Sequence, residues 1–218
     1  MFKNILKIGK RTSLLNSASE ELLTMLERAE NMLVAVPNRM SGDEAAQIDM
    51  ARSDRDINAG ERMVRRLILE HLTLNPNQDL PTSLALLSVV HDAERLGDYV
   101  KSLMELNQWI DVWHQDSGQA ASIRSIHETA CGLFEPLIRG VRDSAIEDGR
   151  LVMQRHEEIK VRTDTLLKEL MEKADGPCET AVYALALRYL RRISAHMANI
   201  ASSLVNPLDQ IAGKEKEV

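Results

Sequence analysis

Apolar residues recur along much of this chain at alternating spacings of four and three positions. This spacing places a narrow apolar seam along one side of a helix, as in helices that pack in a bundle. No stretch alternates with a period of two, so we expect no strands. The seam is clearest at three sets of positions: Leu22, Leu26, Ala29, Leu33 and Val36; Leu86, Val89, Ala93, Leu96, Val100 and Leu103; and Ala186, Leu190, Ile193, Met197, Ile200 and Leu204.

Turn-forming residues divide the chain into six segments, each long enough for a helix. Short turns between helices of this kind favour antiparallel bundles whose neighbours cross at about 20°. We therefore predict an all-α fold of two tandem three-helix bundles, with domains at residues 1–116 and 117–218. The turns are "PNRMSGD" at 37–43, "NPNQDLP" at 75–81, "DSGQ" at 116–119, "EDG" at 147–149 and "DGP" at 175–177.

The last three segments repeat the pattern of the first three. Aligning Ala93 with Leu190 sets "AERLGDYVKSL" on "LRRISAHMANI", with an apolar residue opposite each seam position. The second and fifth segments align in the same way, with Ile57 on Ile159. The two halves share few identical residues, so the repeat is one of pattern.

Composition and charge narrow the class of protein. Aromatic residues make up 3% of the chain and charged residues 28%, which suits helices better than sheets. No apolar run approaches the roughly 18 residues that cross a bilayer. The net charge of −6 argues against general binding to nucleic acid, which needs a basic face. Cys131 and Cys178 fit neither a metal motif nor a disulfide framework, so we expect free thiols and a cytoplasmic protein.

The first fifteen residues, "MFKNILKIGKRTSLL", depart from the acidic average. They carry four basic residues and no acid, and they are too short and interrupted for a secretory signal. Two interpretations stay open. The segment either makes a peripheral contact with the inner face of a membrane or with a membrane partner, or it packs on the first helix.

Acidic residues form stripes outside the seams of the second and third segments. Glu94 and Asp98 lie one helical turn apart, with His91 before them on the same stripe. Like charges at this spacing destabilise a helix by roughly 0.2 to 0.5 kcal/mol unless a positive charge compensates them. If the two segments are antiparallel neighbours, both stripes converge on one oxygen-rich patch. The stripe on the second segment consists of Asp54, Asn58 and Glu61.

Carboxylates and an amide oxygen without thiolates suit a divalent cation such as iron, manganese or magnesium better than structural zinc. A metal site at Glu94, Asp98, Asp54, Asn58 and Glu61 is therefore one interpretation. The other is a solvated surface on which Asp98 pairs weakly with Lys101 and Glu61 with Arg65.

The equivalent positions of the second half have the opposite character. A cation would be repelled there, so we expect any metal in the first half only. The basic copy would either hold an anion or an acidic partner surface, or be an ordinary solvated face. In the order of the five acidic-patch positions along the chain, the equivalents are His156, Lys160, Thr163, Arg191 and Ala195.

These motifs resemble the PhoU-type family of phosphate-uptake regulators. "DAERLGDYVKSLMEL" is similar to the family's hallmark at the start of the last helix in each three-helix repeat, and "SDRDINAGE" is similar to its acidic pattern on the preceding helix. "RYLRRISAHMANIASSLVNP" resembles the second hallmark with its acids replaced, since Arg191 and Ala195 cannot ligate a metal. The chain therefore looks like a divergent member whose second metal motif is degenerate.

The resemblance implies a protein without catalytic activity that acts by binding partners. It implies a divalent metal (iron, manganese, magnesium or zinc) at Glu94 and Asp98, with Asp54, Asn58 and Glu61 facing them. It also implies a homodimer and contact with a phosphate transporter, either ATP-driven or sodium-coupled, and with a sensor kinase.

Other functions are alternative interpretations of the same residues. A ferritin-like di-metal enzyme needs inward-facing Glu-x-x-His pairs, and the sequence has none. A plain helical scaffold or a helical metal-binding protein unrelated to phosphate stays open. Trp109 and Trp113, one turn apart, favour a packing cluster at the end of the third helix; if exposed, they would be the first candidates for contact with a transporter or a second copy.

Overall fold

The computed structural model of this chain describes residues 13–37, 49–172 and 177–206. Within these ranges all regular structure is helical, as the apolar spacing predicts. The helices are α1 (Ser13–Ala35), α2 (Met50–Leu74), α3 (Leu80–Glu105), the short 3-10 helix η3 (Leu106–Gln108), α4 (Gly118–Cys131), α5 (Phe134–Asp143), α6 (Ile146–Glu172) and α7 (Pro177–Val205).

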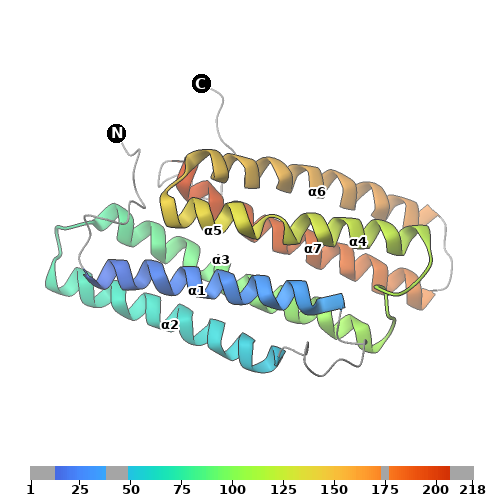
Figure 1. Cartoon of the computed structure of the whole chain (residues 1–218), viewed down its shortest axis with the longest axis horizontal. Coiled ribbons are helices and arrows are strands. Elements are labelled where there is room, and N and C mark those ends of the chain that lie inside the picture. The colour runs from blue at the N-terminus through green and yellow to red at the C-terminus, as the bar shows by residue number, and fades with distance from the viewer. Residues whose placement is uncertain (1–12, 38–48, 173–176, 207–218) are drawn as a thin grey trace.

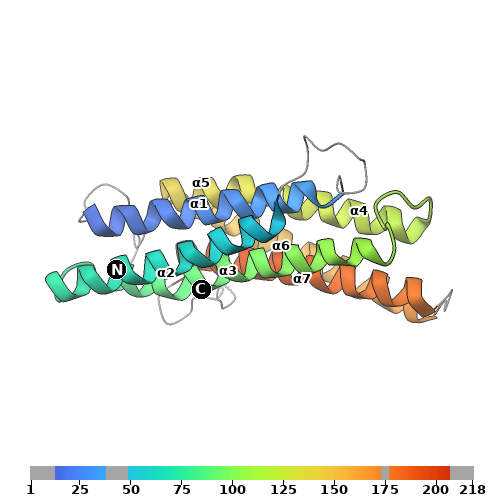
Figure 2. The ribbon, with the colours of Figure 1, turned by 90° about the horizontal axis from the view of Figure 1, so that it is seen from below.

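The helices form two three-helix bundles that lie side by side (Figure 1). In the first, α1, α2 and α3 all pack on one another, and in the second the broken rod of α4 and α5 packs with α6 and α7. Figure 2 shows α1 beside α4 and α5 along one side of the molecule, with α2, α3 and α7 along the other. The long contact between the bundles is made by α3 and α7, which run antiparallel. The predicted fold of two tandem bundles is confirmed.

The predicted fourth helix is interrupted. Its hydrogen-bonded run ends at Cys131 and resumes at Phe134, so α4 and α5 are two pieces of one rod. Counted in this way, the described residues hold the six long helices that were expected. The next boundary was misplaced: "EDG" at 147–149 lies in the first turn of α6, and the turn comes earlier, at Ser144, whose φ of 55° ends α5.

A single hydrophobic core runs through both bundles. The predicted seam positions from Leu22 to Val36, on α1 and just after it, and those on α3 are all fully buried. On α7 the seam is buried from Ala186 to Ile200, with Leu204 only partly covered. Because α3 and α7 pack together, their apolar sides contribute to one shared interior. The predicted boundary between residues 116 and 117 falls in the turn just before α4, at Ser117, which caps that helix by accepting a hydrogen bond from the Ala120 backbone N–H at 3.1 Å.

The contacts between α3 and α7 support the repeat alignment independently. The alignment of Ala93 with Leu190 also pairs Asp92 with Tyr189 and Tyr99 with His196. In the structure Asp92 contacts His196, and Tyr189 contacts Tyr99 with ring centroids 6.1 Å apart. Each contact joins the Asp92/Tyr189 position of one bundle to the Tyr99/His196 position of the other. A pseudo-two-fold axis between α3 and α7 requires this exchange.

Three sequence-based expectations concern the protein's surroundings. Among the described residues no helix is long and apolar enough to cross a membrane. Cys131 and Cys178 are both free thiols, and burial raises the pKa of Cys131 to about 12. Residues 1–12, where contact with a membrane surface was expected, lie outside the described residues.

Candidate functional site

The acidic stripes of α2 and α3 come together because the two helices approach closely at Gly97. A Cβ atom at this position would lie 3.0 Å from Cδ1 of Ile57, so only a residue without a side chain fits without a shift. Gly97 belongs to the segment "ERLGD" that carries Glu94 and Asp98. The glycine therefore sets the distance between the two acidic stripes.

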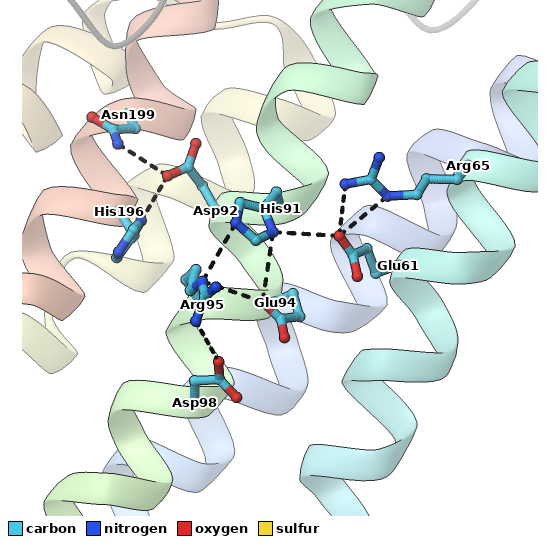
Figure 3. Close-up of polar contacts among 9 residues, drawn as sticks. All are labelled: Glu61, Arg65, His91, Asp92, Glu94, Arg95, Asp98, His196 and Asn199. Carbon is cyan, nitrogen blue, oxygen red and sulfur yellow. Dashed lines mark hydrogen bonds and ion pairs between the residues drawn. The ribbon is translucent and has the colours of Figure 1, made fainter.

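Glu61 on α2 and Glu94 on α3 converge on the ring of His91 (Figure 3). Nδ1 of His91 lies 3.4 Å from Oε1 of Glu61 and 3.7 Å from Oε2 of Glu94. Both carboxylates are largely covered, with side chains 18% and 14% exposed. The predicted convergence of the two stripes is thus present at this pair of glutamates.

Arginines complete the electrostatics of this cluster. Arg95 donates to Nε2 of His91 at 3.4 Å and to Oδ2 of Asp98 at 3.0 Å, and Arg65 donates to Oε1 of Glu61 at 2.8 Å. Because Nε2 of His91 accepts, the ring proton is on Nδ1 and faces the two glutamates. The positive charge missing at the i+4 positions is therefore supplied mainly by Arg95, three residues before Asp98.

Asp54 and Asn58 lie further along the stripe on α2. Asp54 accepts a hydrogen bond from Nζ of Lys101 on α3 at 3.1 Å, and Asn58 is partly exposed. Of the two weak pairs expected on a solvated surface, Glu61 with Arg65 is present, whereas Lys101 pairs with Asp54 and Asp98 pairs with Arg95. The hydrogen bond and charge of Asp54 raise the pKa of Lys101.

Glu94 is the least satisfied acid of the cluster. Its Oε2 atom is buried and accepts no hydrogen bond from the described residues, while Nδ1 of His91 and Nε of Arg95 both lie 3.7 Å away. Burial raises the pKa of Glu94, and the charges of Asp98 and Glu61 act in the same direction, against those of Arg95 and His91. An unsatisfied buried carboxylate oxygen is a place where a cation would be stabilised.

The donor set fits a divalent cation only in part. Glu61 and Glu94 supply converging carboxylate oxygens, but no group of three His, Cys, Asp or Glu side chains in the described ranges is arranged to hold a metal ion. Asp98 and Asp54 are each held by a basic side chain, from Arg95 and Lys101. A metal would therefore bind first at Glu61 and Glu94. Asp98 or Asp54 could become a further ligand only after breaking its ion pair with Arg95 or Lys101.

The equivalent face of the second bundle is a basic groove on α6 and α7. Four of the five positions that correspond to the acidic patch line it, and Thr163 is buried instead. The reversal of charge inferred from the repeat is therefore a property of one continuous surface. The four residues are His156, Lys160, Arg191 and Ala195.

The sequence pattern did not identify a polar link between α3 and α7. Oδ1 of Asp92 accepts hydrogen bonds from Nδ1 of His196 at 2.6 Å and from Nδ2 of Asn199 at 2.9 Å (Figure 3). The ring of His196 also stacks on Tyr99, with centroids 5.4 Å apart. The sequence offered one sign of this link. A polar residue directly precedes a seam residue on α3 and on α7: Asp92 precedes Ala93, and Asn199 precedes Ile200.

The two tryptophans have different environments. Trp113 is buried, donates from Nε1 to Oδ1 of Asn107 at 2.7 Å and packs against the ring of His127. Trp109 is 69% exposed. The packing cluster is thus confirmed for Trp113 alone, and because α3 ends at Glu105 both residues lie in the turns that follow it.

Comparisons with known proteins agree with this arrangement. A protein-family model, the PhoU domain, matches residues 15–106. A comparison with curated proteins found no match. The phosphate transport system regulatory protein PhoU from Streptococcus pneumoniae has a similar structure, with a TM-score of 0.74 and 17% identity over 87% of this chain and 92% of its own.

The crystal structure of PhoU from Pseudomonas aeruginosa is also similar, with a TM-score of 0.77 and 21% identity over 88% of this chain and 95% of its own. These likenesses extend through the second bundle, beyond the residues that the family model matches. The PhoU domain model thus matches residues 15–106, and the chain has the fold of these two PhoU proteins along most of its length.

Proposed function

We propose that this protein regulates phosphate transport by binding a phosphate transporter or the signalling partner of that transporter. The observation that supports this most is the PhoU domain at residues 15–106, together with a fold shared with a phosphate transport system regulatory protein over most of both chains. Regulation by binding needs surfaces rather than a catalytic constellation. The acidic patch that Glu61 and Glu94 form on α2 and α3, and the exposed Trp109, supply such surfaces.

The test of this role is uptake of radiolabelled phosphate by cells that lack the gene. Loss of the protein is expected to deregulate import when phosphate is plentiful and to alter the response to phosphate starvation. Restoring the native gene should reverse both effects. Unchanged uptake together with an unchanged starvation response would rule out the role.

Trp109 is the proposed contact with the transporter. Large exposed aromatic side chains are frequent anchors of protein interfaces, where truncation to alanine costs about 2 kcal/mol or more of binding free energy. Trp109→Ala should therefore fail to restore regulation although the protein accumulates normally. Leu69→Ala is the matched control, because Leu69 on α2 is 68% exposed and outside the proposed contact.

Sedimentation of the native protein and of Trp109→Ala separates the two partners considered for this side chain. If Trp109 contacts the transporter, both proteins should have the same mass in solution. A homodimer that Trp109→Ala dissociates would instead make Trp109 part of a contact between copies. A dimer unaffected by the change would place the dimer contact elsewhere.

We further propose that a divalent cation binds between Glu61 and Glu94. Both carboxylates face the same point, and Oε2 of Glu94 accepts no hydrogen bond among the described residues. The cation would replace the Nδ1–H group of His91 and the guanidinium of Arg65 as the partners of these glutamates, and could then recruit Asp98. It would supply charge compensation at the surface that meets the partner, with no chemical step.

Titration calorimetry with Mn²⁺, Fe²⁺, Zn²⁺ and Mg²⁺ tests the metal site. The native protein should bind at least one of them, and the double variant Glu94→Ala with Asp98→Ala should not. The control is Glu128→Ala with Glu169→Ala, which removes the same charge at two exposed acids of the second bundle. Absence of binding, or equal binding by both double variants, would eliminate the site without bearing on the regulatory role.

A further inference from the structure

A basic groove on the second bundle is a cavity that the proposed function leaves unused. It lies between α6 and α7 and has a volume of about 310 Å³. Residues one turn apart on each helix line it, so both helices present basic groups to the same space. The lining residues are His156, Lys160, Arg188, Arg191, Arg192 and Ala195.

The groove carries more positive than negative charge. Lys160 pairs with Glu157 at 3.0 Å, and Arg191 pairs with Asp164. Arg188 and Arg192 are exposed and have no ion-pair partner among the described residues. Two positive charges are therefore left without compensation in one concave surface, which concentrates the field and attracts anions.

The size of the groove argues for a ligand larger than a single phosphate. At about 310 Å³ the groove lies at the lower end of the range of small-molecule pockets, about 300 to 1,000 Å³. Ala195 contributes to this space because it has a methyl group where Asp98 stands in the first bundle. Arg188 and Arg192 lie one turn apart on α7, so their guanidinium groups can each bind one of two neighbouring anionic groups.

The protonation of His156 responds to the charges in the groove. Ser194 donates its hydroxyl to the backbone carbonyl of Arg191, so its oxygen accepts from Nδ1 of His156 at 2.9 Å. Nε2 is then the ring nitrogen that can gain a proton. Burial lowers the pKa of His156; Glu157 opposes this, and Lys160 and Arg191 add to it. An anion near these cations would raise that pKa again.

We propose that this groove binds a small free anion with two or more phosphoryl groups, of the pyrophosphate type. Arginine guanidinium groups hold phosphoryl oxygens through paired N–H donors, and two of them here have no competing carboxylate. Lys160 on the opposite helix provides a third positive contact. The second bundle is in this sense a binding module for an anion, whereas the first presents acids.

Titration calorimetry with pyrophosphate at about 0.15 M salt tests the proposal. The native protein should bind one equivalent, more tightly than it binds orthophosphate or citrate. Arg188→Ala with Arg192→Ala should weaken binding about tenfold or more, and Ala195→Asp should abolish it by adding a carboxylate to the groove. Arg62→Ala with Arg66→Ala, at exposed positions of α2, is the control and should bind as the native protein does.

Two further measurements decide the identity of the ligand. Saturating pyrophosphate should move the imidazole resonances of His156 and raise its pKa in an NMR titration, without changing His114. Flotation with vesicles that contain phosphatidylglycerol distinguishes a lipid headgroup. Binding to vesicles alone, equal binding of citrate, or a loss of affinity shared by the α2 control would each overturn the proposal.

Discussion

The α2–α3 face of the first bundle and the α6–α7 face of the second occupy the same place in the repeat and carry opposite charge. On the first face the acids Glu61 and Asp98 have basic partners within 3.0 Å. On the second face the cations outnumber their acids, and Arg188 and Arg192 are left over. The buried apolar sides of the helices hold the bundles together, so the two outward faces could change chemistry while the fold stayed the same.

The largest expected effect comes from separating α2 from α3. Gly97→Leu places a side chain where even a Cβ would meet Ile57 at 3.0 Å, and overpacking of this kind costs about 2 to 3 kcal/mol. Urea denaturation should show this loss of unfolding free energy. The equivalent position in the second bundle is Ser194, so this close approach belongs to the acidic face.

Gly118→Leu is the matched control for that change. Gly118 begins α4, and a Cβ atom added there would meet no atom of another part of the chain within 4 Å. The stability of this variant should change by about 0.5 kcal/mol or less. Equal losses from the two substitutions would mean that the α2–α3 approach at Gly97 is not a tight contact.

A smaller effect is expected from breaking the link that joins the two faces. His196→Ala removes one of the two donors to Asp92, whose side chain is only 15% exposed. We expect the free energy of unfolding to fall by about 1 to 2 kcal/mol, because the mostly buried carboxylate of Asp92 then keeps only Asn199 of these two donors.

A double-mutant cycle with Asp92→Ala measures the coupling directly. The cycle should give an interaction energy of about 0.5 kcal/mol or more between the two side chains. His114→Ala, at an exposed histidine paired with Asp111, should cost less. Additive effects of His196→Ala and Asp92→Ala would contradict the link.

The third effect is a difference in pH dependence. The pKa of His156 is lowered in the folded protein, mainly by burial, so its contribution to stability is present above about pH 6.5 and is lost as pH falls through the lowered value. His156→Gln should therefore lose less stability than the native protein between pH 7 and pH 5.

Thermal denaturation of both proteins across this range makes the comparison. Burial also lowers the pKa of His127, but His127 is present in both proteins, so the difference isolates His156. Parallel pH profiles would show that the basic groove does not disfavour the charged imidazole.

The smallest effect has the opposite sign and belongs to the acidic face. The pKa of Glu94 is raised, mainly by burial, so the charged form costs stability as pH rises through that value. Glu94→Gln should raise the unfolding free energy by about 0.5 kcal/mol or less at pH 7 in the absence of metal, and by nothing near pH 3. Glu128→Gln, at an exposed acid, should leave both values unchanged; a loss of stability in Glu94→Gln would overturn the assignment.

The sequence predicts the packing better than the surface. Seam residues such as Leu26, Val89 and Ile193 are fully buried because helical spacing alone decides which side of a helix faces its neighbours. The break between Cys131 and Phe134 was missed, since Gly132 is a single weak signal and the apolar pattern continues through α5.

The candidate site was predicted in outline only. The stripes of α2 and α3 do meet at Glu61 and Glu94, as antiparallel neighbours require. The ion-pair partner of each acid was not predictable from the sequence. Arg95 and Lys101 are long side chains, and their rotamers depend on the neighbouring helix. The α3–α7 link involves residues more than 100 positions apart, which no local pattern relates.

The single interior that α3 and α7 share has a consequence for any attempt to divide the molecule. Cutting the chain after Asp116 would open the apolar side of α3 that now rests against α7, and water would meet a long hydrophobic strip. Each half would then expose an apolar surface prone to self-association, and the same strip on another copy would be the partner most readily at hand. Expressed alone, the first half should appear as dimers or aggregates held together along that strip.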